Sequence, residues 1–475
     1  YRPELTERDA FQIGTAWARV GVAVTEHQHI QVAYSRQRAD DVLYPYLQMD
    51  AVYDDADRFG FRWDGRVPGS ALSGFSLQGY YTEVRHWMTD AFRTSAGGDR
   101  GYSMGTLAAT RAVGGKFEAG LLRDWTVGIE AYSRFWGAAT EMAGAGYQPQ
   151  YAIPDVSMTN VGLYSEYRNQ LTDTLTLTSG VRVDRVESQA DESRANTDLY
   201  FAYNNTRSTS EVDAFASGNL RLEYKSASGF GVSAGAGSGV QVPEPTERYF
   251  ALRRMGSDWV GNPGLNPSRN NGVEGSVSYE RSGFYLQSDF FVNWVDDFVG
   301  LISQTRINAV PGIMNSLARS YTNVDARLTG TEVSVVFPLE DRWFLSGDVS
   351  YVRGTKTPMP EHGLNSRNLS EIPPLRSRAV LRYDDGRYFG VTEGVFSTAQ
   401  RATDFDLGEE ETPSYGILNL SGGLRRGRVR VTGGIENVFN RNYSEHLSYQ
   451  RDPFRSGIRV MEPGRNFYVN VGVGF

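Results

Sequence analysis

The final residues, FYVNVGVGF (467–475), decide the fold class because apolar and polar positions alternate through them. One face carries Phe467, Val469, Val471, Val473 and Phe475, and the other carries tyrosine, asparagine and glycine. Side chains of a β-strand point alternately to its two sides, so a period of two indicates a strand with one apolar face.

The same alternation recurs along the chain, for example in WTVGIEAYSRF (125–135), TLTLTSGVRVD (174–184), FYLQSDFFVNW (284–294) and RVRVTGGIENVF (428–439). The connections are of two kinds that follow one another in turn. Tight turns fall near Asp173, Gly283 and Gly427, whereas long polar loops span 38–55, 139–155, 188–208, 241–271, 299–316, 355–369, 399–412 and 440–461. Short turns on one side and long loops on the other are typical of a transmembrane β-barrel.

The alternative is a large soluble all-β protein such as a propeller. A propeller would repeat a signature about every 40–50 residues, and no such repeat is found. The strands are long enough to cross a bilayer, which takes about 9–11 residues, and aromatic residues gather near their ends. We therefore predict an all-β fold, a transmembrane antiparallel β-barrel.

Counting the segments between turns gives roughly nineteen strands, beginning with one over about 8–21, whereas single-chain bacterial barrels have even numbers. The odd count predicts that part of the barrel lies before residue 1. We expect residues 1–475 to form a single barrel domain.

Composition excludes several classes of function. The chain has no cysteine, which rules out disulfides and thiolate metal sites within it. The net charge of −8 gives no reason to expect a nucleic-acid partner. The mean hydropathy is −0.43, and no run approaches the ~18 apolar residues of a transmembrane helix. We find no supported catalytic constellation, so we do not expect an enzyme.

Several segments resemble the TonB-dependent outer-membrane receptors. The matching segments are GVQVPEPTERYF (239–250), GNPGLNPSRNNGVEGSVSYE (261–280), NVDARLTGTEVSV (323–335), EIPPLRSRAVLRY (371–383), IENVFNRNYSEHL (435–447) and EPGRNFYVNVGVGF (462–475). The resemblance implies a barrel of the 22-stranded type, with the N-terminal plug and the first few strands absent here. It also implies the outer membrane of a Gram-negative bacterium, contact with lipid and lipopolysaccharide, and active uptake of a scarce substrate driven by the inner-membrane TonB complex through the plug.

Within that family, four segments look most like the TonB-dependent copper receptors: DVLYPYLQMD (41–50), VRHWMTD (84–90), ERYFALRRM (247–255) and SEHLSYQRDPF (444–454). In those receptors a His-x-Met pair on the barrel wall holds copper together with a Cys-x-x-x-Met pair on the plug. His86 and Met88 match the barrel half. The resemblance therefore implies copper as the transported ligand, with no resident cofactor.

The residues themselves predict where this pair points. In the strand 74–88, Phe75, Leu77 and Tyr81 form the apolar face, which should meet lipid. His86 and Met88 then both point into the lumen, about 6.5–7 Å apart along the strand. Imidazole and thioether are soft-to-borderline ligands that suit copper. The alternative is that both side chains pack against a plug.

Other candidates remain open. Met255, Met314 and Met359 lie in or near predicted loops and are candidate thioether ligands on a path inward, or incidental. His446 is predicted to have a structural role. The acidic runs 54–59 and 406–411 could bind cations, but such runs are more often solvated loop tips. A ferric siderophore or another metal chelate is the alternative substrate, and a passive porin is the alternative of a different class.

Overall fold

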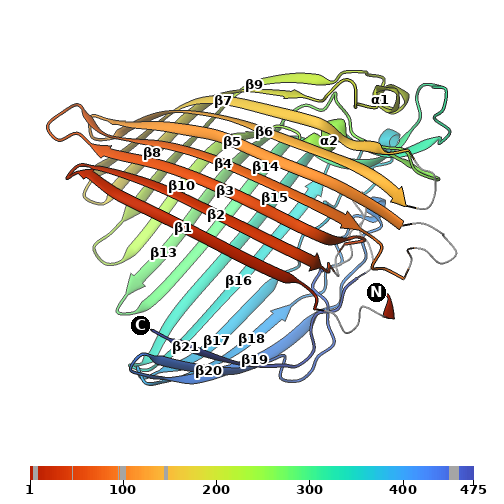
Figure 1. Ribbon diagram of the computed structural model, residues 1–475. Coiled ribbons are helices and arrows are strands. Elements are labelled where there is room, and N and C mark those ends of the chain that lie inside the picture. The colour runs from red at the N-terminus through yellow and green to blue at the C-terminus, as the bar shows by residue number, and fades with distance from the viewer. Residues whose placement is uncertain are drawn as a thin grey trace.

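The computed structural model describes residues 1–3, 9–44, 47–94, 96, 103–143, 148–448 and 459–474. The protein is a single sheet curled around a central space, with long loops gathered at one end (Figure 1). Among these residues no helix is long and apolar enough to span a membrane. The predicted all-β fold is confirmed.

Within the described ranges the sheet has 21 strands, of which β11 (Ala251–Leu252) and β12 (Asp258–Val260) are very short. The long strands are β1 (Gln12–Thr25), β2 (Gln28–Val42), β3 (Asp50–Arg66), β4 (Leu72–Thr89), β5 (Ser103–Leu121), β6 (Trp125–Ala143), β7 (Gln150–Thr172), β8 (Leu175–Gln189), β9 (Ser210–Lys225), β10 (Phe230–Gln241), β13 (Ser268–Arg281), β14 (Phe284–Thr305), β15 (Leu317–Glu340), β16 (Trp343–Lys356), β17 (Arg376–Asp384), β18 (Tyr388–Ser397), β19 (Tyr415–Arg426), β20 (Val429–Glu436) and β21 (Asn466–Val473).

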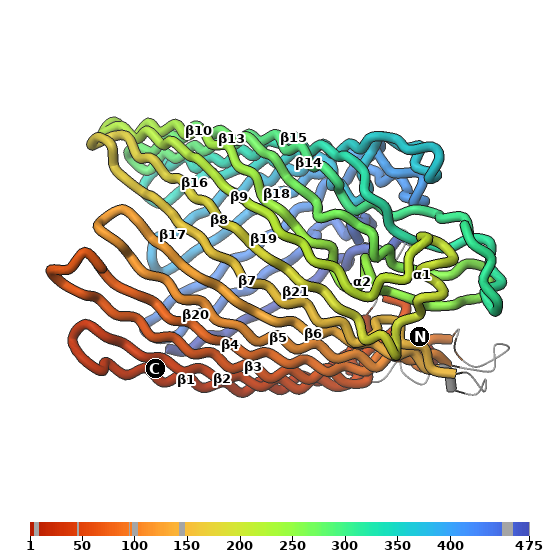
Figure 2. The backbone as a smooth tube through the Cα atoms, turned by 90° about the horizontal axis from the view of Figure 1, so that it is seen from above, coloured from red at the N-terminus to blue at the C-terminus, as the bar shows by residue number. Residues whose placement is uncertain are grey.

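Each long strand pairs antiparallel with the next long strand along the chain, which makes a continuous meander. β11 and β12 form a small ribbon in the loop between β10 and β13, and β12 also pairs in parallel with the start of β15. Short turns lie at one end of the sheet, and long loops lie at the other, near the helices α1 (Thr197–Asn204) and α2 (Pro245–Tyr249) (Figure 2). The predicted arrangement of connections is therefore confirmed.

The two faces of the sheet differ as the alternation predicts. Val181 and Val183 of β8 are 66% and 53% exposed on the outer face. Arg182, between them, turns inward and pairs with Asp184 at 2.7 Å and Glu130 at 2.9 Å. An apolar outside and an ion-paired polar inside are what a barrel in a membrane requires.

Several strands run further than predicted, so some loops are shorter. β7 has 23 residues and β15 has 24, more than twice the length needed to cross a bilayer. β6 ends at Ala143 and β7 begins at Gln150, so the loop between them is shorter than the predicted loop 139–155. The antiparallel ladder continues beyond the apolar band because its hydrogen bonds do not depend on the surrounding solvent. A further long connection, 90–102, was not predicted.

The first and last strands are edges of the sheet. β1 pairs only with β2, and β21 only with β20, among the strands described. All 14 residues of β1 are exposed. Unpaired backbone groups are costly in hydrocarbon, so both edges require a hydrogen-bonding partner inside a membrane.

The buried core lies in the loops rather than inside the sheet. Leu199, Tyr200 and Tyr203 of α1 are 0% exposed and pack with Val260 and Ile313 from two other loops. The short helix α2 also lies at the loop end of the barrel. There Tyr249 packs against the inner faces of β5 to β8. Two 3-10 turns, η3 (Pro360–His362) and η4 (Phe405–Leu407), belong to a second group of loops.

Candidate metal site on the inner barrel wall

The strand register places His86 and Met88 on the inner face. His86 of β4 lies opposite Asp54 of β3 and Ala108 of β5. Residues opposite one another in neighbouring strands share a face. Ala108 is 5% exposed and packs in the buried cluster around Tyr249, which lies inside the wall. His86 therefore faces inward, and Met88, two residues further along the strand, faces inward with it, as predicted.

Trp87 lies on the opposite, outer face. It is 42% exposed and sits opposite Tyr53 and Leu107. Glu83 and Arg85 share this outer face and pair with each other at 2.9 Å. The paired charges lie between Tyr81 and Trp87, towards the loop end of β4.

The side chains of His86, Met88 and Asp54 carry no hydrogen bond or ion pair within the described part of the chain. Some inward charges lower on the wall are paired, such as Lys116 with Glu118 at 2.8 Å. The donor atoms near His86 are therefore available to a ligand. The sequence placed Asp54 in an acidic run, 54–59, that could bind cations or form a solvated loop tip, but the run lies within β3. The sequence did not place Asp54 beside His86, because that depends on the register between β3 and β4.

A second sulfur lies on the same inner face. Met88 is opposite Thr106 of β5, and Met104 is two residues from Thr106, one step towards the loops. Diagonal neighbours of this kind lie about 7–8 Å apart. The backbone of Met104 is fixed by Asp90, whose Oδ1 accepts from the Met104 amide at 2.8 Å. Sequence reasoning missed Met104 for the same reason as Asp54.

Met255 and Met314 lie at loop tips, far out from the wall. They are 97% and 88% exposed. Their loops are joined by Asn315, whose Nδ2 donates to the Arg254 carbonyl at 2.7 Å and to Asp258 Oδ1 at 2.7 Å. The structure thus brings two exposed thioethers onto neighbouring, hydrogen-bonded segments. Met359 differs, because it packs against Ile302 and Val324 and has a packing role.

The family model described as TonB dependent receptor-like, beta-barrel matches residues 7–438. The chain belongs to the TonB-dependent receptor family. This family consists of outer-membrane transport proteins rather than enzymes. No curated protein matches the sequence significantly.

Solved structures share the fold of this TonB-dependent receptor chain. The copper transporter OprC has a TM-score of 0.81 at 21% identity, over 98% of this chain and 72% of that chain. The FrpB iron transporter from Neisseria meningitidis (F3-3 variant) gives 0.66 at 12% identity, over 98% and 72%. The ferric yersiniabactin uptake receptor FyuA from Yersinia pestis gives 0.67 at 14% identity, over 98% and 71%.

The predicted structural role of His446 in this receptor agrees with its position. Its ring is buried, with Nδ1 2.7 Å from Thr412 Oγ1 and Nε2 3.1 Å from Glu409 Oε1. Asp406 of the same loop lies 3.7 Å from the buried Lys356 ammonium. The run 406–411 is therefore only in part the solvated tip that the sequence predicted. Glu410 and Glu411 are exposed, whereas Asp406 and Glu409 bind groups in neighbouring loops.

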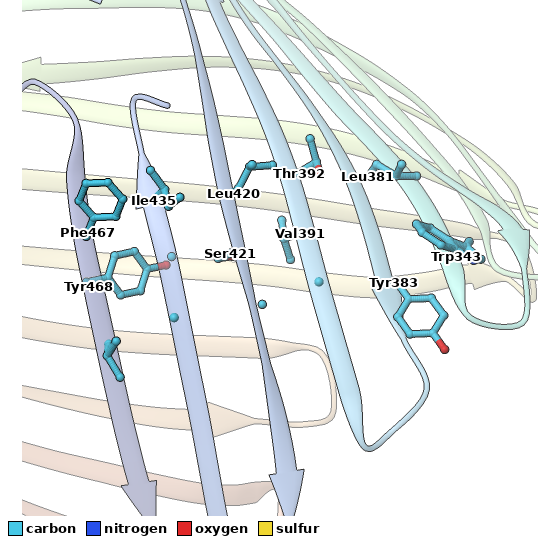
Figure 3. A pocket seen from close by; sticks show the side chains of 15 residues that line it. Trp343, Leu381, Tyr383, Val391, Thr392, Leu420, Ser421, Ile435, Phe467 and Tyr468 are labelled. Atoms are coloured by element: carbon cyan, nitrogen blue, oxygen red, sulfur yellow. The ribbon is translucent and has the colours of Figure 1, made fainter. Parts of the chain in front are cut away.

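Neither clusters of metal-ligating side chains nor the groove on the wall of the receptor offers a further metal site among the described residues. Across the described ranges, no three His, Cys, Asp or Glu side chains come close enough together to hold a metal ion. The groove across β16 to β21 (Figure 3) is lined by residues such as Trp343, Leu381, Tyr383, Leu420 and Ile435, with no charged or sulfur-containing side chain.

Proposed function

We propose that this chain is the barrel wall of an active copper importer, with His86 and Met88 as two ligands of the transported copper. One observation carries the proposal: an imidazole and a thioether lie on the same inner face, and neither has a partner within the described part of the chain. The similarity to the copper transporter OprC, at a TM-score of 0.81, supports it.

The chemistry favours copper over harder metals. Thioether and imidazole suit Cu(I), whereas Ca²⁺, Mg²⁺ and Fe(III) prefer oxygen ligands. Two ligands do not hold the metal tightly, so we propose Met104 as a further thioether on the wall. The resemblance to the copper receptors adds a Cys-x-x-x-Met pair on a plug as the source of the remaining ligands.

The setting of the barrel follows from its two faces. We propose residues 1–475 as one domain in the outer membrane of a Gram-negative bacterium, with lipid and lipopolysaccharide against the apolar outer face. The inner-membrane TonB complex would supply energy by acting on a plug in the lumen. The acidic net charge of −8 again gives no reason to expect a nucleic-acid partner.

We propose Met255 and Met314 as the outermost ligands on the path of the copper. Both thioethers are almost fully exposed, and their loops are hydrogen-bonded to each other. Exposed thioethers can exchange a soft metal quickly because each binds it weakly. Removing them should slow uptake without changing how much copper the inner site holds.

The test measures the copper bound by the full-length protein before and after the double substitution His86→Ala and Met88→Ala. We expect the copper-to-protein ratio, determined by elemental analysis, to fall by about one. The matched control is His27→Ala with Met461→Ala, which removes one imidazole and one thioether elsewhere and should leave the ratio unchanged. An unchanged ratio in the His86 and Met88 variant would contradict the assignment.

The second candidate is a ferric siderophore or another metal chelate. It is favoured by the stacking of Arg254 on Trp259, with the guanidinium carbon 3.9 Å from the ring centroid, near the exposed loop tip. A cation over an aromatic face suits a large anionic chelate. Iron-limited growth on a panel of chelates separates this candidate from copper uptake. Membership of the receptor family disfavours a passive porin.

A further inference from the structure

Asp54 is the inward carboxylate that lies opposite His86 on the wall. Several other inward carboxylates are ion-paired, such as Asp184 with Arg182 at 2.7 Å and Asp348 with Arg378 at 2.8 Å. No ion pair or hydrogen bond holds the Asp54 side chain within the described ranges. Its opposite neighbours are Ala39 on one side and His86 on the other. The imidazole is therefore the polar group that faces this carboxylate across the β3–β4 pair.

The surroundings leave these two side chains free to approach each other. Directly opposite residues on antiparallel strands have Cβ atoms about 4.5–5.5 Å apart. The cross-strand neighbours on either side of this pair are alanines: Ala39 lies opposite Asp54 on β2, and Ala108 and Ala138 follow His86 on β5 and β6. Their methyl side chains are too small to separate Asp54 from His86. No hydrogen bond joins Asp54 to His86 in this structure, but a Cβ separation of this size lets an imidazole and a carboxylate meet when their side chains rotate.

We propose that Asp54 is the positioning residue of His86, an inference that rests on the proposed copper function. A metal-bound histidine usually donates its second ring N–H to a carboxylate, which fixes the ring and makes the ligating nitrogen more basic. Asp54 accepts this hydrogen bond, and the other nitrogen of His86 is left for the transported copper. The negative charge of Asp54 also favours a cation at this point of the wall.

The next residue along β3 provides a matched control. Asp55 is also a carboxylate, but it points to the outer face, where it lies 3.4 Å from Arg38. It lies opposite Arg85 rather than His86. Substitution of Asp55 therefore removes the same charge from the same strand without touching the inner wall.

The experiment measures the Cu(I) dissociation constant of the full-length protein by competition with a chromophoric chelator. Asp54→Ala is expected to weaken binding by about 10–100-fold, as loss of a carboxylate partner typically does. Asp54→Glu should restore part of the affinity, and Asp55→Ala should leave it unchanged. Asp54→Asn keeps the size of the side chain without its charge, so it should also weaken binding and serves if the alanine variant does not fold.

X-ray absorption of the bound copper separates positioning from ligation. We expect the same nitrogen and sulfur neighbours in the wild type and in Asp54→Ala, and loss of an oxygen neighbour would instead make Asp54 a ligand and overturn the proposal. Affinity equal to wild type in Asp54→Ala would also overturn it. If the wild type binds no copper, or if His86→Ala binds it normally, the proposed function itself fails.

Discussion

The role of a single residue in this protein depends on the face it occupies and on the partner it meets. His86, Trp87 and Met88 are consecutive, yet only the first and third face the inside. Asp54 and Asp55 divide in the same way between the inner wall and an outer ion pair. Successive residues of a strand point to opposite faces. Asp55, a carboxylate next to Asp54 on the other face, is therefore a control for the role proposed for Asp54.

Arg248 offers a prediction at the residue scale. Its guanidinium is 1% exposed, and it donates to both oxygens of Asp213, at 2.8 and 3.2 Å, and to the Leu265 carbonyl at 2.8 Å. Arg248→Ala leaves the half-buried Asp213 without its ion-pair partner, which should cost up to about 3–5 kcal/mol. Denaturant unfolding of the protein in detergent measures this loss.

Arg207 is the control for Arg248. It pairs with Asp198 at 2.5 Å, but both side chains are about half exposed, at 49% and 55%. Exposed ion pairs contribute about 0–1 kcal/mol, so Arg207→Ala should cost less than about 1 kcal/mol. If Arg248→Ala and Arg207→Ala lower the free energy of unfolding equally, burial does not determine how much the Arg248–Asp213 pair stabilises the protein.

At the scale of elements, the loops after β16, β18 and β20 are tied together by one buried polar cluster. Glu409 is its centre, because Oε1 accepts from the Glu371 amide and Oε2 accepts from the Asp404 amide, each at 2.7 Å. His446 contacts the same carboxylate from the third loop. Lys356 binds Asp404 at the far side of the cluster. The cluster thus joins the three loops to one another through polar contacts.

This cluster predicts a dependence on pH. Burial opposes ionisation of Glu409, but the hydrogen bonds from His446 and from two backbone amides outweigh it and lower the pKa of the carboxyl below its ordinary 4.5. A lowered carboxyl pKa stabilises the fold fully above pH 4.5, and the stabilisation is lost as the pH falls through the folded value. The advantage of wild type over Glu409→Gln, about 1.5–3 kcal/mol at neutral pH, should therefore shrink in acid.

Hydrogen exchange of the amides in 404–412, corrected for intrinsic rates, measures this difference between the two proteins. Asp404 has a pKa raised by burial, and it contributes with the opposite sign, but it is present in both proteins and cancels. Glu410→Gln, on the exposed neighbour, should show no such pH-dependent difference from wild type. An advantage over Glu409→Gln that stays constant down to acid pH would contradict the assignment.

At the scale of the whole molecule, the outer face must tolerate lipid while the inner face tolerates charge. Val277 and Ser278 of β13 are adjacent and point to opposite faces. Val277 lies opposite Val232 and Ser288 on the outside, and Ser278 lies opposite Gly231 and Gln287 on the inside. The same substitution at the two positions therefore tests the orientation of the wall.

Val277→Arg should destabilise the protein in a bilayer by up to about 2–4 kcal/mol, because a cation on the lipid face loses its hydration. Ser278→Arg should cost much less, since the inner face is polar. Folding titrations in lipid vesicles give both free energies. Similar costs at the two positions would contradict the inside-outside assignment of β13.

The sequence by itself determined the features that depend on one strand at a time. Alternation identified the barrel, and it placed His86 and Met88 together on the inner face, because the direction of successive side chains follows from local backbone geometry. The family motifs added the kind of barrel and the proposed substrate.

Only the tertiary structure decided which residues of different strands and loops lie next to each other. Asp54 opposite His86, Met104 diagonal to Met88 and the joined loops of Met255 and Met314 all depend on register or on long-range loop packing. A shift of one residue between β3 and β4 would turn Asp54 away from His86 and leave the pattern within each strand unchanged. Register is set by turns and by hydrogen bonds between distant residues, so the sequence of one strand does not contain it.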